Sequence, residues 1–295
     1  MKANGMMWVI ANENAGSGSG KTMLERTKEL LRQKNIPFQV KTTVHPGDAG
    51  KYADEAMNQG IRDLICLGGD GTNFEIINGL AGRFASLYFV PCGTGNDFIK
   101  MFGYPGDPIR ALECQLNGIP SRIDIGKAND LFFLNVSGSG FDVEVLKLAA
   151  RYKHLGQGIL PYLLGIFSAL KHFSPLPVEM TVDGKTEKKE VTIFSVGNGA
   201  YIGGGMKAVP GAKTDDGLFD VVVADRMSTL SILRFLKKFI AGKHTTLKEI
   251  HCLRCSELTV RCPGMTVDLD GELIPMDEVH YELIPGAVEI RIPVG

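Results

Sequence analysis

The sequence predicts an α/β protein in which an N-terminal domain built on a parallel sheet precedes a mostly antiparallel, β-rich second domain. Two features of the 295-residue chain support this fold class. Up to about residue 91, short apolar runs alternate with segments of helical periodicity, as in βα units. From about residue 122, short strand-like runs with Asp-Gly turns replace that alternation.

In the first domain, the apolar runs predict strands and the residues at helical spacing predict helices between them. We expect strands at 8–11, 38–43, 64–67 and 87–91 and helices at 23–34, 49–59 and 76–81. This order implies a parallel sheet covered by helices. Ligands of such sheets bind at the carboxyl ends of the strands.

In the second domain, strands are expected at 132–136, 178–185, 191–196, 219–223, 258–260 and 265–269. The predicted domains cover residues 1–122 and 123–285, and a return of the segment at about 286–295 to the first domain is left open. A cleft between two domains is the expected place for a substrate.

A glycine-rich stretch, Gly68-Gly69-Asp70-Gly71-Thr72, follows the third predicted strand. Glycines that adopt positive φ beside a helix N-terminus present backbone N–H groups that bind phosphate oxygens. The alternative is a tight turn in which Asp70 or Thr72 caps the helix. The three glycines around one Asp favour a nucleotide-phosphate site.

Four polar loops should meet at the carboxyl edge of the sheet, at 12–20, 43–47, 68–72 and 92–98. Each is rich in Gly, Thr, Asn or Asp. In the last loop, Asn96 and Asp97 are expected either to cap a helix or to contact a ligand. The edge is therefore predicted to hold one polar site made from four segments.

The stretch Ala15–Thr22 resembles a relaxed phosphate-binding loop of the GxxxxGK[ST] kind. In such a loop Lys21 would contact phosphates and Thr22 would contact magnesium. The first Gly of the pattern is replaced by Ala, however, and no apolar strand ends in the Asp that usually accompanies it. We consider this interpretation the weaker one.

Composition excludes several classes of protein. The chain is 44% apolar and 22% charged with a net charge of −1, so it is typical of a globular protein and shows no bulk attraction for nucleic acid. Six cysteines in a chain of this length favour a reducing cytoplasm over a disulfide framework. The N-terminus is too poor in apolar residues for a signal sequence, and the longest apolar run, 159–170, is shorter than a membrane span. We expect a soluble, cytoplasmic protein, with peripheral contact at the inner membrane face left open.

Taken together, the motifs resemble those of the diacylglycerol kinase catalytic family, in its bacterial soluble lipid kinase branch, which is related to sphingosine and ceramide kinases. The matching stretches are Asn12–Gly16, Gly68–Thr72, Gly93–Phe98 and Asp270–Glu272. Their order and spacing agree with the family over nearly the whole chain. One departure is the first loop, where Asn-Glu-Asn-Ala-Gly replaces the usual Asn-Pro-x-Ser-Gly.

The resemblance implies that ATP is the phosphate donor and that the ATP-binding residues lie in the strand-end loops. They would be Asn12, Glu13, Asn14, Ala15, Gly16, Thr43, Gly69, Asp70, Gly71, Thr72, Asn73, Phe74, Glu75 and Thr94. Asp70 is the carboxylate best suited to hold the catalytic magnesium, because Mg²⁺ prefers hard oxygen ligands beside phosphates.

The acidic pair Asp270 and Glu272 carries the catalytic role by resemblance. Alternation along a strand places Asp268 and Asp270 on one face, with Glu272 beyond the Gly271 turn. A carboxylate near the γ-phosphate suffices to orient an acceptor hydroxyl and to accept its proton. We favour Glu272 as the proton acceptor and Asp270 as its partner or as a magnesium ligand. An exposed hairpin with solvated acids is the alternative.

A second, structural magnesium is implied by resemblance in the loop 210–218. Its ligands would be the carbonyl groups of Lys213 and Leu218 and the side chain of Asp216. A plain Asp-Gly turn is the alternative.

Two further stretches leave alternatives open. The apolar stretch 160–170, preceded by Lys147, Arg151, Lys153 and His154, forms either an acyl-chain wall beside a basic patch or a buried helix. Cys252 and Cys255, with Cys262 nearby, have zinc-like spacing but no second pair of ligands, so we do not expect a zinc site.

The sequence therefore predicts an ATP- and Mg²⁺-dependent lipid kinase that phosphorylates a diacylglycerol-like hydroxyl at a membrane surface. The alternatives are an NAD kinase-like enzyme with a small soluble acceptor and a nucleotide-binding regulatory protein without turnover. A homodimer is left open, and no nucleic-acid partner is expected.

Overall fold

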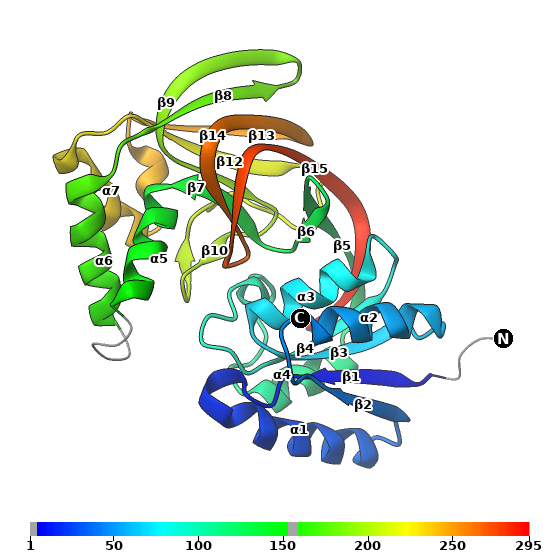
Figure 1. Ribbon diagram of the computed structural model, residues 1–295. Coiled ribbons are helices and arrows are strands. Elements are labelled where there is room, and N and C mark those ends of the chain that lie inside the picture. The colour runs from blue at the N-terminus through cyan, green and yellow to red at the C-terminus, as the bar shows by residue number, and fades with distance from the viewer. Residues whose placement is uncertain (1–4, 153–158, 295) are drawn as a thin grey trace.

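The computed structural model describes residues 5–152 and 159–294, with the side chains of residues 17 and 159–163 outside the description. The first domain begins β1 (Met7–Ala11), α1 (Ala15–Gln33), β2 (Phe38–Thr42), α2 (Asp48–Asn58), β3 (Asp63–Gly68), α3 (Asp70–Leu80) and β4 (Ser86–Pro91). These strands pair in parallel in the order β2-β1-β3-β4. Helices α2 and α3 cover one face of this sheet, and α1 and α4 (Pro108–Leu116) cover the other (Figure 1).

The second domain is a layer of antiparallel strands with three helices at its far end (Figure 1). Its strands are β6 (Leu131–Phe133), β7 (Val136–Gly140), β8 (Leu176–Val182), β9 (Lys185–Gly197), β10 (Tyr201–Ile202), β11 (Met206–Lys207), β12 (Phe219–Asp225), β13 (Ile250–Cys255) and β14 (Glu257–Leu269). Its helices α5 (Phe141–Arg151), α6 (Ile159–His172) and α7 (Thr229–Ile240) contribute to one apolar cluster with β9, β12 and the β10–β11 hairpin.

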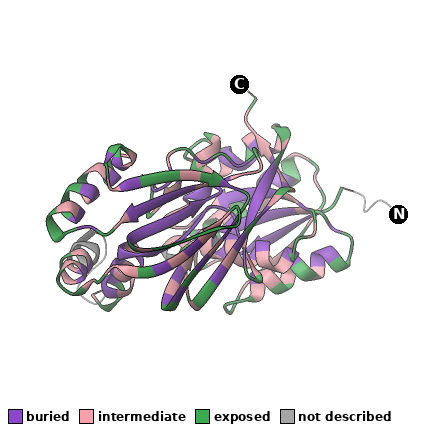
Figure 2. Cartoon of the chain, turned by 90° about the horizontal axis from the view of Figure 1, so that it is seen from above, coloured by how far each residue is buried: buried purple, intermediate pink, exposed green. Residues whose placement is uncertain are grey.

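Two long strands connect the domains. The strand β15 (Glu272–Ile292) pairs antiparallel with β14 and with β5 (Ile119–Ala128), and near its end it lies parallel to β4 through Glu289 and Ser86. One continuous sheet therefore runs from β13 in the second domain to β2 in the first. In Figure 2 the strands are mostly buried, whereas the helices expose their outer faces. The two domains are thus joined by one continuous sheet.

The fold class is as predicted, and most differences concern where elements begin. Helix α1 starts at Ala15, which packs against the apolar cluster of β1 and α1, so the predicted loop 12–20 ends after three residues. Helix α3 starts at Asp70, inside the predicted turn 68–72. The strand predicted at 132–136 is divided into β6 and β7, whereas the two predicted at 258–269 form the single strand β14, with a register shift between Arg261 and Met265.

Several elements were not predicted from sequence. They are the helices α4, α5 and α7 and the strands β5, β10, β11, β13 and β15. The apolar stretch 160–170 lies in α6. No helix in the described part of the chain is both long and apolar enough to cross a membrane.

Candidate active site

The loops at the carboxyl ends of β1 to β4 enclose a cavity of about 660 Å³, here called the strand-end cavity. All four predicted segments reach it, although α1 shortens the first one. Of the residues predicted to bind ATP, those that line it are Asn12, Asn14, Ala15, Thr43, Gly69, Gly71, Thr72, Phe74 and Glu75. Val44, His45 and Pro46, which belong to the predicted loop 43–47, also line it, although only Thr43 of that loop was among the residues expected to bind ATP.

The glycines after β3 serve close packing and do not adopt positive φ. Gly69 has a φ of −111°, and Gly68 and Gly71 are also outside the positive region, so this expectation was wrong. Gly69 is itself the N-cap of α3, and no side chain caps the helix, so the capping alternative was wrong as well. A Cβ on Gly69 would lie 2.9 Å from the Cα of Gly93. Glycine is required because the backbones after β3 and β4 nearly touch.

Glu75 fixes the rim of the strand-end cavity. Its carboxylate accepts hydrogen bonds from the backbone N–H groups of Gly47 (2.8 Å) and Ala49 (3.1 Å). These donors belong to the start of α2, which otherwise has no side-chain cap. Glu75 therefore holds the loop after β2 against α3, and its carboxylate is already engaged.

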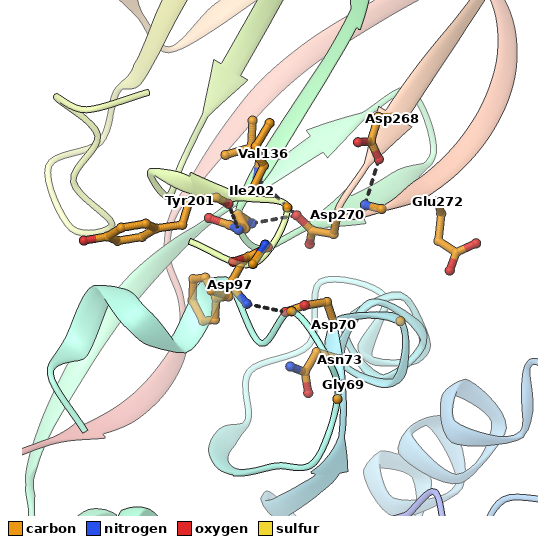
Figure 3. A pocket seen from close by; sticks show the side chains of 18 of the residues that line it. Gly69, Asp70, Asn73, Asp97, Val136, Tyr201, Ile202, Asp268, Asp270 and Glu272 are labelled. Carbon is orange, nitrogen blue, oxygen red and sulfur yellow. Dashed lines mark hydrogen bonds between the residues drawn. The ribbon is translucent and has the colours of Figure 1, made fainter. Parts of the chain in front are cut away.

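A second cavity, of about 470 Å³, lies between the two domains and is here called the interdomain cavity. The predicted residues Asp70, Asn73 and Thr94 line it, together with Asp268, Asp270 and Glu272 (Figure 3). Glu13 and Gly16 line neither cavity. The two cavities share Gly69, Gly71, Gly93 and Glu272, so they adjoin at the glycine turn.

Asp70 and Asp97 form one side of the interdomain cavity. Asp70 accepts a hydrogen bond from the backbone N–H of Asp97 (2.9 Å), while burial and the nearby Asp97 charge raise the pKa of Asp70. Asp97 forms an ion pair with Lys100 (2.7 Å) and accepts a hydrogen bond from the N–H of Gly204 (2.8 Å). Asp97 thus links the first domain to a glycine loop of the second.

Asn96 has a different role from Asp97. Its amide side chain bonds both backbone groups of Gly93, accepting from the N–H at 3.0 Å and donating to the carbonyl at 2.7 Å. It therefore closes the loop after β4 on itself.

Asp270 forms the opposite side of the cavity, at the turn between β14 and β15. Its carboxylate accepts hydrogen bonds from the N–H groups of Leu134 (2.7 Å), Asn135 (2.9 Å) and Val136 (3.1 Å). Burial nevertheless raises its pKa to about 7. These three N–H groups bond Asp270 where the predicted strand 132–136 is interrupted, which accounts for the break between β6 and β7.

Two more carboxylates line the cavity near Asp270. Asp268 accepts a hydrogen bond from the N–H of Gly271 (2.7 Å), and burial, followed by the charge of Asp142, raises its pKa to about 8. Asp142, in the first turn of α5, accepts a hydrogen bond from the N–H of the adjacent Val143 (2.9 Å), and burial raises its pKa to about 6. Sequence reasoning missed Asp142, because a single Asp in an amphipathic segment carries no signal.

Glu272 differs from these half-buried acids, because it is exposed and stands where the two cavities meet. A Cβ on Gly71 would lie 3.3 Å from its Oε1 atom. The carboxylate of Glu272 is thus directly beside the first turn of α3. It is the accessible carboxylate with contact to both cavities.

The acids suit a divalent cation. Asp70 and Asp270 face each other across the interdomain cavity, and the charge of Asp70 contributes to the raised pKa of Asp270 (Figure 3). The Oδ1 atom of Asn73, which also lines the cavity, is buried without a hydrogen-bond partner. Carboxylate and amide oxygens are the hard ligands that Mg²⁺ prefers. Among the described residues, however, no group of three or more His, Cys, Asp or Glu side chains lies close enough together to hold a metal ion, so the magnesium site stays a prediction.

The loop 210–218 is hydrogen-bonded to Asp124, a residue that was not predicted from sequence. The buried Asp124 accepts hydrogen bonds from the N–H groups of Gly217 and Gly286, both at 2.8 Å. The Asp216 carboxylate forms an ion pair with Arg254. The structural magnesium at Lys213, Asp216 and Leu218 stays a prediction, and Mg²⁺ would have to share Asp216 with that arginine.

The remaining motifs do not join the site. Lys21 and Thr22 lie inside α1 and line neither cavity, so their positions do not support the phosphate-loop alternative. Cys255 is buried and Cys252 exposed on strand β13.

The proposed acyl-chain wall and basic patch are only partly described. Lys147 donates a hydrogen bond to the Thr266 hydroxyl (2.7 Å). Lys153 and His154 and the side chains of 160–163 lie outside the described residues, so that interpretation stays a prediction.

The fold and the site define a two-domain protein with a glycine-lined cavity at the ends of a parallel sheet and an acid-lined cavity between the domains. Two family models match the chain. The diacylglycerol kinase catalytic domain matches residues 6–128. The YegS C-terminal NAD kinase beta sandwich-like domain matches residues 135–292.

Curated relatives and solved structures agree with these matches. A diacylglycerol kinase of Mycobacterium tuberculosis is 29% identical over 97% of this chain and 95% of its own length. A probable lipid kinase YegS-like of Pseudomonas putida is 31% identical over 90% of this chain and 88% of its own. A crystal structure of a diacylglycerol kinase from Bacillus anthracis superposes with a TM-score of 0.79 at 29% identity, covering 97% of this chain and 96% of that one.

The chain therefore belongs to the family of diacylglycerol kinases and YegS-like lipid kinases, as its motifs predicted.

Proposed function

We propose that this protein is an ATP-dependent lipid kinase that transfers the γ-phosphate of ATP to the hydroxyl group of a diacylglycerol-like lipid. The observation that carries the proposal is the junction of the two cavities at Gly69, Gly71, Gly93 and Glu272. A donor in one cavity and an acceptor in the other would meet beside a carboxylate. Bringing two reactants together in this way is the main requirement of phosphoryl transfer.

The strand-end cavity suits the nucleotide. Its walls supply the start of α3 and backbone N–H groups of the glycine turns, which favour phosphate oxygens. Asn12, Asn14 and Thr43 add polar side chains at the ends of β1 and β2. When bound, Mg²⁺ would be held by Asp70, Asp270 and Asn73 and would neutralise charge on the transferring phosphate.

The interdomain cavity suits the acceptor. Val136, Leu146 and Ile202 give it apolar walls, and Asp142 and Asp268 offer oxygen atoms that accept hydrogen bonds from hydroxyl groups. A lipid with a small hydroxyl-bearing head and apolar chains matches both features.

In the reaction, the acceptor oxygen forms a bond to the γ-phosphorus as the bond to the β–γ bridging oxygen breaks, and ADP leaves. Glu272 orients the acceptor hydroxyl and accepts its proton late in the transfer. The carboxylate is exposed at the cavity junction, so the proton can pass on to solvent. Asp270, held by the N–H groups of Leu134, Asn135 and Val136, keeps the hairpin that carries Glu272 against the segment between β6 and β7.

The test is transfer of labelled γ-phosphate from ATP and Mg²⁺ to a panel of lipids in mixed micelles, with NAD as a soluble acceptor. We expect a labelled lipid, and a loss of about 100-fold or more in its formation for Glu272→Gln with ATP binding retained. Asp277→Asn, at an exposed acid further along β15, is the matched control and should keep full activity.

Other outcomes favour the alternatives. Labelled NAD would indicate an NAD kinase-like enzyme, which the description of the C-terminal family model keeps in view. ATP binding with no labelled acceptor would indicate a regulatory protein. Either result would refute the proposed function.

A further inference from the structure

Helix α7 carries apolar side chains on both of its faces. Ile232, Phe235 and Phe239 are buried against the second domain. On the opposite side, Leu230 is 78% exposed and Ile240 is 68% exposed. A soluble surface helix normally places polar residues on that side, so the outward stripe requires an explanation.

The outward stripe follows helical spacing. Leu230, Leu233, Lys237 and Ile240 are three or four residues apart and so lie along one line on the helix. Leu233 is 45% exposed, and Lys237 and its neighbour Arg234 are also exposed. The outer face of α7 therefore alternates apolar and basic side chains.

The charge around α7 is one-sided. The segment 226–248 contains six Lys or Arg residues and no Asp or Glu, although the whole chain has a net charge of −1. Within the described part of the chain, neither Arg234 nor Lys237 forms a hydrogen bond or ion pair. No acidic side chain in that part of the chain neutralises these two charges, so they are available for an anionic partner.

The position of α7 connects it to the interdomain cavity. The helix contacts β11, which forms a hairpin with β10. Tyr201 and Ile202 of that hairpin line the interdomain cavity. In Figure 1, α7 stands with α5 and α6 at the end of the second domain that is far from β15. A surface held by α7 would therefore lie one element away from the proposed acceptor.

We propose that the outer face of α7 docks the protein on an anionic lipid bilayer, with Leu230, Leu233 and Ile240 entering the headgroup region and Arg234 and Lys237 meeting lipid phosphates. Apolar insertion and basic attraction together are what hold an amphipathic helix in the plane of a membrane. The inference rests on the proposed function for its purpose, since a lipid acceptor must be reached at a membrane, but bilayer binding itself requires no ATP.

The experiment is co-sedimentation of the full-length protein with vesicles of phosphatidylcholine, either alone or with about one-third phosphatidylglycerol. The two test variants are Leu230→Ser/Leu233→Ser and Arg234→Gln/Lys237→Gln. We expect binding to the anionic vesicles that weakens with salt, and a partition coefficient lowered about tenfold or more in each variant. Circular dichroism checks that the variants stay folded.

Matched controls make the same changes elsewhere. Lys185→Gln/Lys188→Gln alters two exposed lysines of the β8–β9 hairpin, and Val294→Ser alters an apolar residue that is 66% exposed. Both controls should bind as the unaltered protein does. Equal binding by the α7 variants and the controls would overturn the proposal.

A second outcome would also overturn it. If the protein sediments as a dimer without vesicles and Leu230→Ser/Leu233→Ser makes it a monomer, the face is an interface between two copies of the chain. Phosphate transfer, measured separately, distinguishes the two proposals. Vesicle binding through α7 with no labelled lipid would refute the proposed function alone, whereas labelled lipid with unchanged vesicle binding in the α7 variants would refute the docking surface alone.

Discussion

Replacing Asp142 by Asn should stabilise the protein. Burial raises the pKa of Asp142 from 3.8 to about 6, because the carboxylate faces a partly apolar cavity with one N–H donor, from its neighbour Val143. An acid with a raised folded-state pKa binds more protons in the folded than in the unfolded protein, so stability falls as pH rises from about 4 to about 6. Above that window the whole penalty is present.

The size of the effect follows from the shift. A difference of about two pKa units corresponds to about 3 kcal/mol at neutral pH. Asp142 keeps partial exposure through the cavity, and water there screens the charge, so we expect about half of this value. Asp142→Asn should therefore raise the free energy of unfolding by about 1.5 kcal/mol at pH 7.5 and by about half as much at pH 5.

The assay is urea unfolding of the protein without nucleotide or magnesium, followed by circular dichroism at both pH values. Glu144→Gln, in the same first turn of α5, is the control. Both changes remove an acid from the helix N-terminus, but only Asp142 lines the cavity, so Glu144→Gln should give no stabilisation. The reasoning is refuted if Asp142→Asn is no more stable than the unaltered protein at pH 7.5, or if its gain is the same at pH 5. A stabilised variant that transfers phosphate more slowly would indicate that Asp142 is kept for acceptor binding.

Three further predictions concern the first domain. In Gly79→Ala the new Cβ would overlap the backbone oxygen of Gly50, so we expect the free energy of unfolding to fall by about 2 kcal/mol or more in the same urea experiment. Gly106→Ala is the control and should be neutral, because a Cβ at Gly106 meets nothing within 4 Å. Glu75→Gln leaves one acceptor oxygen for two N–H groups, so the KM for ATP should rise about threefold to tenfold with a smaller change in kcat; an unchanged KM would contradict this role. Lys21→Ala should change ATP affinity by less than about twofold in a titration, and a tenfold loss would restore the phosphate-loop interpretation.

The first domain could be predicted closely because its strands are buried on both sides. The residues of β1 and most of β3 are all buried, so these strands read as uninterrupted apolar runs. Because the carboxyl ends of parallel strands lie at one edge of a sheet, the sequence alone predicted that the four loops lie together. Element boundaries were less accurate, since α1 and α3 begin within glycine-rich stretches.

Parts of the second domain were harder to predict because β13, β14 and β15 bury only some of their residues, whereas β7 and β12 are almost wholly buried. Strand β15 contains Pro275, Pro285 and several exposed acids, so no apolar run marks it, yet it forms the longest strand and joins the domains. The role of the glycines after β3 was equally hidden. A glycine in the sequence can serve either a positive φ or a close approach of two backbones. The structure distinguishes these two roles, because a Cβ on Gly69 would meet Gly93.

The interrupted strand at 132–136 shows why a local prediction fails at this site. Leu134, Asn135 and Val136 have the sequence character of a strand, but their N–H groups bond a carboxylate more than 130 residues away. A buried Asp270 needs these donors, because an ionised carboxylate in a cavity is costly without hydrogen bonds. The same bonds hold the β14–β15 turn against the segment between β6 and β7, and in that position Asp270 faces Asp70 and Glu272 lies against Gly71. At residues 134–136 the hydrogen bonds to Asp270 therefore outweigh the local preference for a continuous strand.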